Sequence, residues 1–223
     1  MSVDREAYAR ILGELSAPGV TLVAVSKTKP VEDIEALYAL GQRDFGENYV
    51  QELVAKQAVL PADIRWHFIG HLQRNKVKYI APFVHLIHGV DTLKLLKEVD
   101  RQASACGRSI DCLLQMHIAS EETKFGLDRE ELMGLLEETG AGASLPHVRI
   151  RGLMGMASFT DDRARVRSEF SSLRSVFEEA RSRFFGADGS FSILSMGMSG
   201  DYAVAVEEGG NMVRIGSLLF GAR

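Results

Sequence analysis

Short runs of hydrophobic residues alternate along the chain with segments in which hydrophobic positions recur every three or four residues. Such runs are typical of strands buried on both faces, and the recurring positions are typical of amphipathic helices. We predict strands at residues 21–25, 44–47, 65–69, 86–90, 110–118, 148–156, 191–196 and 212–219. We predict helices at residues 3–15, 31–40, 49–60, 73–80, 92–107, 129–138, 161–185 and 201–208, with Asp91 and Asp128 as helix caps.

These elements form a regular alternation, in which each of the first seven strands is followed by a helix. Such alternation is typical of parallel βαβ units, and eight units close a TIM barrel. An open doubly wound sheet is the alternative, but no GxGxxG motif follows the first strand. We therefore predict one α/β domain over residues 1–223, a (β/α)8 TIM barrel with an extra N-terminal helix.

The composition narrows the classes of function. The chain has 223 residues, of which 46% are hydrophobic and 25% charged, and its net charge is −4. This mild acidity argues against a nucleic-acid partner. No hydrophobic stretch approaches the roughly 18–20 residues of a membrane span, and no signal-peptide pattern occurs at the start. Cys106 and Cys112 form no CxxC pair and no zinc-ligand spacing occurs, so we expect reduced cysteines, no metal site and a cytoplasmic protein.

Lys27 lies where the first predicted strand stops and a loop begins. Pro30, whose fixed φ suits the first turn of a helix, marks the end of that loop. Ligands of α/β folds bind at the carboxyl ends of the strands, so Lys27 is a candidate reactive amine at a pocket mouth. On position alone, a solvated surface lysine is the more common alternative. Glu47, after the second strand, is expected to pair with a lysine rather than to act in catalysis.

Two serine–glycine segments follow the last two predicted strands. They are SMGMSGD, which contains Ser199, and VRIGS, which contains Gly216 and Ser217. The segments after strands seven and eight are the frequent phosphate site of TIM barrels. Backbone N–H groups before a helix, close backbone approach at a glycine and a serine hydroxyl all suit an anion. The sequence therefore predicts a phosphate site there.

An amine near the first strand and a phosphate cradle near the last two define a ligand that carries a carbonyl group and a phosphate. Pyridoxal 5′-phosphate (PLP) fits, with Lys27 as the Schiff-base amine, and a phosphorylated sugar in an aldolase-type site fits as well. Arg214 lies two residues before Gly216 and is expected on the same side of the strand. A guanidinium near a pyridine nitrogen disfavours its protonation, which weakens the ring as an electron sink.

In these residues the chain closely resembles the YggS/PROSC-type pyridoxal phosphate-binding proteins, also called pyridoxal phosphate homeostasis proteins. The resemblance covers almost the whole chain. The matching motifs are AVSKTKP (24–30), FGENYVQE (45–52), WHFIGHLQRNK (66–76), KFGL (124–127), GLM (152–154), SMGMSGD (195–201) and VRIGSLLFGAR (213–223).

The resemblance implies the fold of the N-terminal barrel of alanine racemases, with PLP as the cofactor. It implies a Schiff base on Lys27 and a pyridine nitrogen beside Arg214. Ser217 departs from the threonine of many members, but either hydroxyl can bind phosphate. The phosphate is expected at Ser199, Gly216 and Ser217, and the ring among Asn48, His67 and Met154.

Several of these residues also have structural interpretations. Asn48 could simply cap the following helix, His67 could be a core histidine, and Met154 could be part of the barrel lining. Lys29 is expected to be a solvated neighbour of the reactive lysine. Lys124 lies in a charged loop, which usually forms a solvated surface, although its motif favours a functional role.

The resemblance implies a protein that holds PLP on Lys27 and supplies or buffers it for recipient apo-enzymes. The alternative is a PLP-dependent amino-acid racemase, which needs a base on each face of the substrate α-carbon. In alanine racemases the second base is a tyrosine from a C-terminal domain of a partner subunit. The chain stops after the eighth strand, so we expect no efficient racemisation and a monomer.

Overall fold

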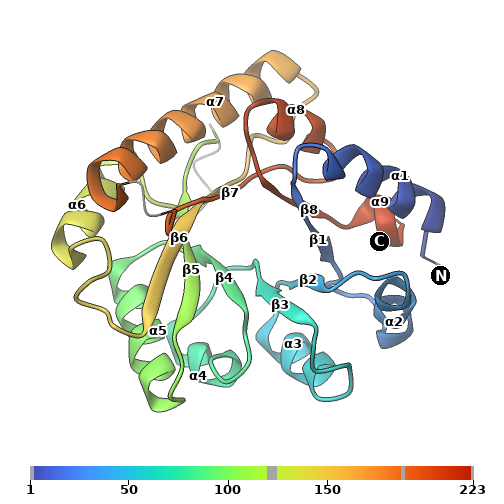
Figure 1. The fold of residues 1–223 in the computed structure, drawn as a ribbon, viewed down its shortest axis with the longest axis horizontal. Coiled ribbons are helices and arrows are strands. Elements are labelled where there is room, and N and C mark those ends of the chain that lie inside the picture. Colours follow the sequence, from blue (N-terminus) through green and yellow to red (C-terminus); the bar gives the residue numbers. More distant parts are fainter. Residues whose placement is uncertain (1–2, 120–124, 187–188, 222–223) are drawn as a thin grey trace.

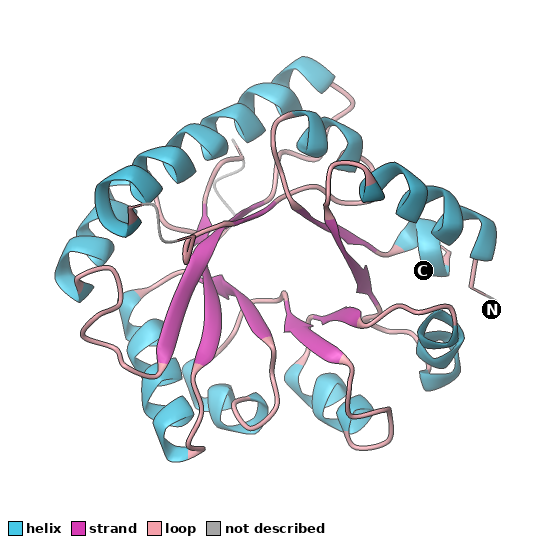
Figure 2. Ribbon diagram, in the orientation of Figure 1, coloured by secondary structure: helices cyan, strands magenta, loops and turns pink. Residues whose placement is uncertain are grey.

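A computed structural model of the chain describes residues 3–119, 125–186 and 189–221. Eight parallel strands form a closed barrel in chain order, and helices surround them as an outer ring (Figure 1, Figure 2). The predicted (β/α)8 barrel with an extra N-terminal helix is therefore confirmed. None of the helices in the described ranges combines the length and hydrophobicity needed to cross a membrane.

The elements follow the predicted alternation closely. The strands are β1 (Thr21–Val25), β2 (Asp44–Glu47), β3 (Arg65–Phe68), β4 (Leu86–Val90), β5 (Ile110–Met116), β6 (Val148–Gly155), β7 (Ile193–Ser195) and β8 (Met212–Ile215). The helices are α1 (Arg5–Ser16), α2 (Val31–Ala39), α3 (Val50–Gln57), α4 (Val77–Ile80), α5 (Leu93–Ala105), α6 (Arg129–Thr139), α7 (Arg163–Ala180), α8 (Tyr202–Glu207) and α9 (Ser217–Phe220). A 3₁₀ turn, η1 (Arg74–Lys76), precedes α4, and a π-helical turn, η2 (Arg181–Phe185), continues α7.

Strand β1 closes the barrel because it pairs with both β2 and β8. Ala24 lies opposite Phe45 on one side and opposite Ile215 on the other. A strand that is paired on both edges and covered by helices must be apolar on both faces, which explains its hydrophobic run. Side chains fill the barrel axis as a packed layer, as TIM barrels require. This layer contains Val23, Leu86, Leu113, Met154 and Met212.

Several boundaries differ from the prediction by a few residues, among them the start of α5 and the end of β8. The hydroxyl of Thr92, rather than the predicted Asp91, caps α5 by accepting the N–H of Leu95. Strand β8 ends at Ile215, and not at residue 219, because the short helix α9 begins at Ser217. This helix brings the end of the described chain back to its start, where the N–H of Asp4 donates to the carbonyl of Leu219.

The sharpest backbone approach in the barrel is at Gly152 of β6. Its φ is +153°, and a Cβ atom built there would lie 1.8 Å from the carbonyl oxygen of Ile193 in β7. No rotation of a side chain relieves such a contact, because the backbone fixes the position of a Cβ atom and the carbonyl oxygen belongs to the backbone. Only glycine therefore lets β6 and β7 pair at this point.

Replacing Asp128 by alanine should lower the free energy of unfolding by about 1 kcal/mol. Asp128 accepts the N–H of Glu131, and the Glu131 carboxylate accepts the N–H of Asp128, which is the predicted capping box of α6. Chemical denaturation monitored by circular dichroism measures the loss. Glu130→Ala, in the same turn but outside the box, is the control and should cost less than about 0.5 kcal/mol. Equal costs in the two variants would contradict the assignment.

Candidate functional site

A cavity of about 680 Å³ opens at the carboxyl ends of the barrel strands. Its volume lies within the range of small-molecule and cofactor sites. The structure brings six of the eight predicted site residues to this cavity, although they come from segments far apart in sequence. These six are Lys27, Asn48, Ser199, Arg214, Gly216 and Ser217.

Lys27 lies two residues beyond the end of β1, and its neighbours hold its backbone on both sides. Ser26 is fully buried, and its hydroxyl donates to the Glu47 carboxylate at 2.6 Å. Thr28 has a φ of +64°, a conformation that β-branched residues rarely adopt. Its N–H donates to the carboxylate of Glu52 at 2.6 Å, which fixes this conformation. The lysine is thus presented by a strained, tightly held turn.

A buried ammonium group ties this turn together. Nζ of Lys56 lies 2.8 Å from the carbonyl oxygen of Ser26, 2.7 Å from the Glu47 carboxylate and 2.6 Å from the Glu52 carboxylate. The predicted pairing of Glu47 with a lysine is confirmed. Burial raises the pKa of Glu47, while the attraction of Lys56 opposes that rise. Lys56 therefore compensates a carboxylate that has no exposed surface.

The two predicted phosphate loops meet at one hydrogen bond. The N–H of Gly216 donates to the hydroxyl of Ser199 at 3.3 Å. The Asp201 carboxylate accepts the N–H of Met198 at 2.6 Å and so orders the loop after β7. Because β8 ends at Ile215, Gly216 lies in the turn beyond the strand and Ser217 begins α9. Both loops line the cavity with serine hydroxyls, which suit an anionic group.

Lys29 also lines the cavity, but its amine is engaged elsewhere. Nζ donates to the carbonyl oxygen of Phe220 at 2.9 Å and to that of Gly221 at 3.3 Å. Lys29 is partly buried at these bonds, so the expected solvated role is replaced by a structural one. It joins the turn after β1 to the segment that follows β8.

Arg214 lies in the floor of the cavity and is 4% exposed. One guanidinium nitrogen donates to the hydroxyl of Ser195 at 2.6 Å, and the other terminal nitrogen donates to the carbonyl oxygen of Gly155 at 3.1 Å. Burial lowers the pKa of Arg214 to about 10, with Asp201 opposing that effect. The group still carries its positive charge at neutral pH, so it offers a ligand only hydrogen-bond donors.

Asn48 supplies an unused acceptor. Within the described ranges, its side-chain oxygen Oδ1 is buried and has no hydrogen-bond partner. A buried polar atom without a partner costs free energy, and a ligand that donates to it removes that cost. Asn48 therefore fits a ligand that carries a hydroxyl or another hydrogen-bond donor.

His67 and Met154 differ from their predicted places. His67 is the third residue of β3, is 1% exposed and does not line the cavity. Met154 packs in the apolar layer along the barrel axis. Both side chains point into the barrel because alternate residues of a strand do so. Their positions agree with the structural interpretations, a core histidine for His67 and barrel lining for Met154. Lys124 falls outside the described residues.

His67 instead belongs to a buried chain of hydrogen bonds along the barrel interior. Its Nε2 lies 3.0 Å from the Asp44 carboxylate, and its Nδ1 lies 2.9 Å from Nε2 of His88. Nδ1 of His88 lies 3.1 Å from the Ser195 hydroxyl that accepts from Arg214. Burial lowers the pKa of His88 far below its usual value, so this histidine is neutral. This chain of hydrogen bonds joins the cavity floor to the opposite end of the barrel.

Sequence reasoning missed Lys56, and of the buried chain of hydrogen bonds it singled out only His67 and Arg214. The position of Lys56 is typical of the surface of an amphipathic helix, and Asp44, His88 and Ser195 lie within strands. The site as a whole presents an amine, a buried guanidinium and two hydroxyl-bearing loops around one cavity. Such a set can capture a carbonyl compound that also carries an anionic group.

Comparison with known proteins identifies the family. The sequence profile described as "Alanine racemase, N-terminal domain" matches residues 6–223. A pyridoxal phosphate homeostasis protein of Pasteurella multocida is 40% identical over 209 residues, which cover 92% of this chain and 87% of that protein. The chain belongs to the pyridoxal phosphate homeostasis protein family. The predicted resemblance to this family is therefore confirmed.

Solved structures of a protein named PipY and of an alanine racemase share the barrel. PipY of Synechococcus elongatus PCC7942 without PLP is 38% identical, with a TM-score of 0.90 over 97% of this chain and 99% of that one. The same protein with PLP bound has a TM-score of 0.88 and the same coverage. An alanine racemase of Streptomyces coelicolor has a TM-score of 0.74 at 20% identity, which shows a common fold over 97% of this chain and 57% of the racemase.

Proposed function

We propose that this homeostasis-family protein binds PLP in the cavity, covalently through Lys27, and holds it for supply to other enzymes. The observation that carries the proposal is one cavity lined by the Lys27 amine, the Arg214 guanidinium and the two loops that the Ser199–Gly216 hydrogen bond joins. The binding of PLP by PipY, which is 38% identical, supports this choice of ligand.

The residues of the cavity suit the groups of PLP one by one. The hydroxyls of Ser199 and Ser217 and the N–H groups of their loops suit the phosphate. The buried acceptor of Asn48 suits a ring hydroxyl. PLP supplies an aldehyde that captures amines and a ring that withdraws electrons when its nitrogen is protonated. Arg214 can only donate hydrogen bonds, so a ring nitrogen beside it stays unprotonated.

The same residues favour a carrier over the competing racemase. A racemase needs an acid–base group on each face of the substrate α-carbon. Among the described residues that line the cavity there is no tyrosine, histidine or cysteine, and the carboxylates are those of Asp161 and Asp201. The Asp201 carboxylate is engaged by the N–H of Met198. Lys29, which could otherwise serve as a base, is bonded to two backbone carbonyls. A ring nitrogen placed beside the Arg214 guanidinium would stay unprotonated, so the ring would withdraw few electrons from a bound amino acid.

Incubation of the PLP-loaded protein with L-alanine should therefore yield D-alanine at far less than one turnover per second. Chiral chromatography of the amino acid, with an authentic alanine racemase as positive control, measures the product. The protein's own absorbance before and after addition of the amino acid checks that PLP stays bound or is released. Turnover within the ordinary enzyme range of roughly 1–10³ per second would overturn the carrier proposal in favour of the racemase.

The carrier proposal also covers the protein's partners, its oligomeric state and its compartment. Recipient apo-enzymes are its proposed partners, and a monomer in the cytoplasm is its proposed state. The two cysteines support a reducing compartment, since Cys112 is buried as a free thiol and Cys106 is exposed as one.

A further inference from the structure

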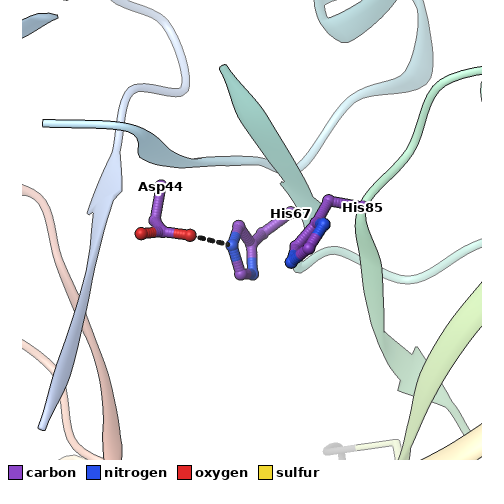
Figure 3. Close-up of side chains that lie close together, drawn as sticks. All are labelled: Asp44, His67 and His85. Atoms are coloured by element: carbon purple, nitrogen blue, oxygen red, sulfur yellow. Dashed lines mark hydrogen bonds and ion pairs between the residues drawn. The ribbon is translucent and has the colours of Figure 1, made fainter. Parts of the chain in front are cut away.

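Three side chains that the proposed function does not use converge at the amino-terminal end of the barrel. Asp44 begins β2, His67 lies within β3 and His85 directly precedes β4. One ligand atom from each lies within 4.8 Å of the other two. Figure 3 shows the Asp44 carboxylate facing the His67 ring, with the His85 ring beside it. We propose that Asp44, His67 and His85 form a binding site for a late first-row divalent metal ion such as Zn²⁺.

The donor atoms suit this class of ion. Two imidazole nitrogens and a carboxylate oxygen are ligands that Zn²⁺, Co²⁺ and Ni²⁺ accept, whereas Mg²⁺ and Ca²⁺ prefer oxygen alone. Metal–ligand bonds of about 2.0–2.2 Å require the ligand atoms to close in to roughly 3–3.5 Å of one another. His85 is exposed, so its side chain can make this adjustment and leaves the ion open to water. Because His85 is exposed, we expect three protein ligands on the ion, with water completing its coordination shell.

Asp44 is already ionised and oriented for such a role. Nε of Arg65 donates to its Oδ1 at 2.7 Å and a terminal nitrogen of Arg65 lies 2.5 Å from its Oδ2. Burial acts to raise the pKa of Asp44, but the hydrogen bonds from Arg65 and His67 outweigh it and hold the pKa well below its usual value. Arg65 thus holds both carboxylate oxygens, of which Oδ1 also faces His67. It orients Asp44 as outer-shell partners orient the ligands of metal sites. The side chain of Arg65 is 47% exposed and can swing toward water as the ion approaches.

The second ring nitrogen of His67 has the buried partner that metal-binding histidines characteristically have. Nδ1 lies 2.9 Å from Nε2 of the fully buried, neutral His88. Because the Asp44 carboxylate only accepts, a neutral His67 without metal carries its proton on Nε2 and accepts from His88 at Nδ1. A metal ion on Nε2 places that proton on Nδ1, so His67 then donates to His88.

The same change of tautomer passes along the chain of hydrogen bonds to the cavity floor. His88, now accepting at Nε2, carries its own proton on Nδ1 and donates it to the Ser195 hydroxyl, which still accepts from Arg214. Each ring keeps one proton, so the exchange of tautomers releases none. Metal binding at one end of the barrel thereby reverses the hydrogen bond between His88 and Ser195 at the other. Sequence spacing hides this site because its ligands come from three separate strands.

Calorimetric titration of the untagged full-length chain with ZnCl₂ tests the site. We expect saturable binding of one ion per chain, and His85→Ala should weaken it at least about tenfold. His85 is exposed, so this variant retains the fold. His71→Ala is the matched control, because His71 also lies beside a carboxylate, 3.3 Å from Asp91, and is exposed. Absence of saturable binding, or an equal loss in both variants, would overturn the proposal.

A second measurement does not depend on the affinity of the site for Zn²⁺. Nitrogen-15 NMR of the histidine rings reports which ring nitrogen carries the proton. Zn²⁺ should move the proton of His67 from Nε2 to Nδ1 and that of His88 from Nε2 to Nδ1, with no such change at His147. Binding of Zn²⁺ that leaves both tautomers unchanged would place the ion elsewhere and contradict the proposed ligand set.

Discussion

Lys27→Ala should abolish the covalent capture of PLP while the protein keeps its fold. The amine is the only group of this side chain that can bond the aldehyde, and the loops around the phosphate cannot replace a covalent link. Lys27 is half-buried at the cavity, outside the apolar clusters of the barrel, so its loss should cost about 1 kcal/mol of stability or less. Absorbance of the PLP-loaded protein measures capture, and thermal unfolding measures the fold.

Lys29→Ala is the matched control for this variant. Lys29 belongs to the same turn and lines the same cavity, but its amine is bonded to the carbonyl oxygens of Phe220 and Gly221. We expect this variant to retain the absorbance of bound PLP. A Lys27 variant that still captures PLP covalently, or one that no longer unfolds cooperatively, would contradict the assignment of Lys27 as the reactive amine.

Lys56→Met should lower the free energy of unfolding by about 3–5 kcal/mol, the cost of removing one partner of a buried ion pair. The Glu47 carboxylate has no exposed surface, and methionine leaves it without a compensating charge. The variant also removes the donor to the carbonyl oxygen of Ser26. The turn that presents Lys27 is then held less firmly, so PLP capture should slow as well. Denaturant unfolding and the rate of absorbance change measure the two effects.

An exposed ion pair provides the comparison for Lys56. Nζ of Lys97 lies 3.1 Å from the Glu138 carboxylate, and the two side chains are 57% and 60% exposed. Lys97→Met should cost less than about 1 kcal/mol, because water screens such a pair. Similar losses in the Lys56 and Lys97 variants would show that burial of Glu47 does not set the stability of this turn.

The fold could be predicted because its signals are local. Strand β1 is a short apolar run that pairs on both edges, and α6 begins at a capping box that two residues define. The end of β8 was placed too late, since residues 216–219 are hydrophobic enough to continue a strand. Helix α9 forms there instead, where it packs near α1 at the start of the chain. Such tertiary preferences override a local pattern.

The site was predictable where residues follow the ends of strands and unpredictable where they lie inside the barrel. Lys27, Ser199 and Gly216 stand in loops whose place in a barrel is known in advance. The depth of His67 depends on which residues of β3 face the axis and on its partners Asp44 and His88. Those partners come from other strands, so only the closed barrel shows that they meet.

Reduction with borohydride tests the central claim most directly. Borohydride converts an imine into a stable amine, so it fixes PLP to whichever lysine holds it. The PLP-loaded protein is reduced, digested and mapped by mass spectrometry, with unreduced protein as the reference. We expect one modified peptide, with the added mass on Lys27. Modification of another lysine in its place, or none at all in a protein that binds PLP, would contradict the account.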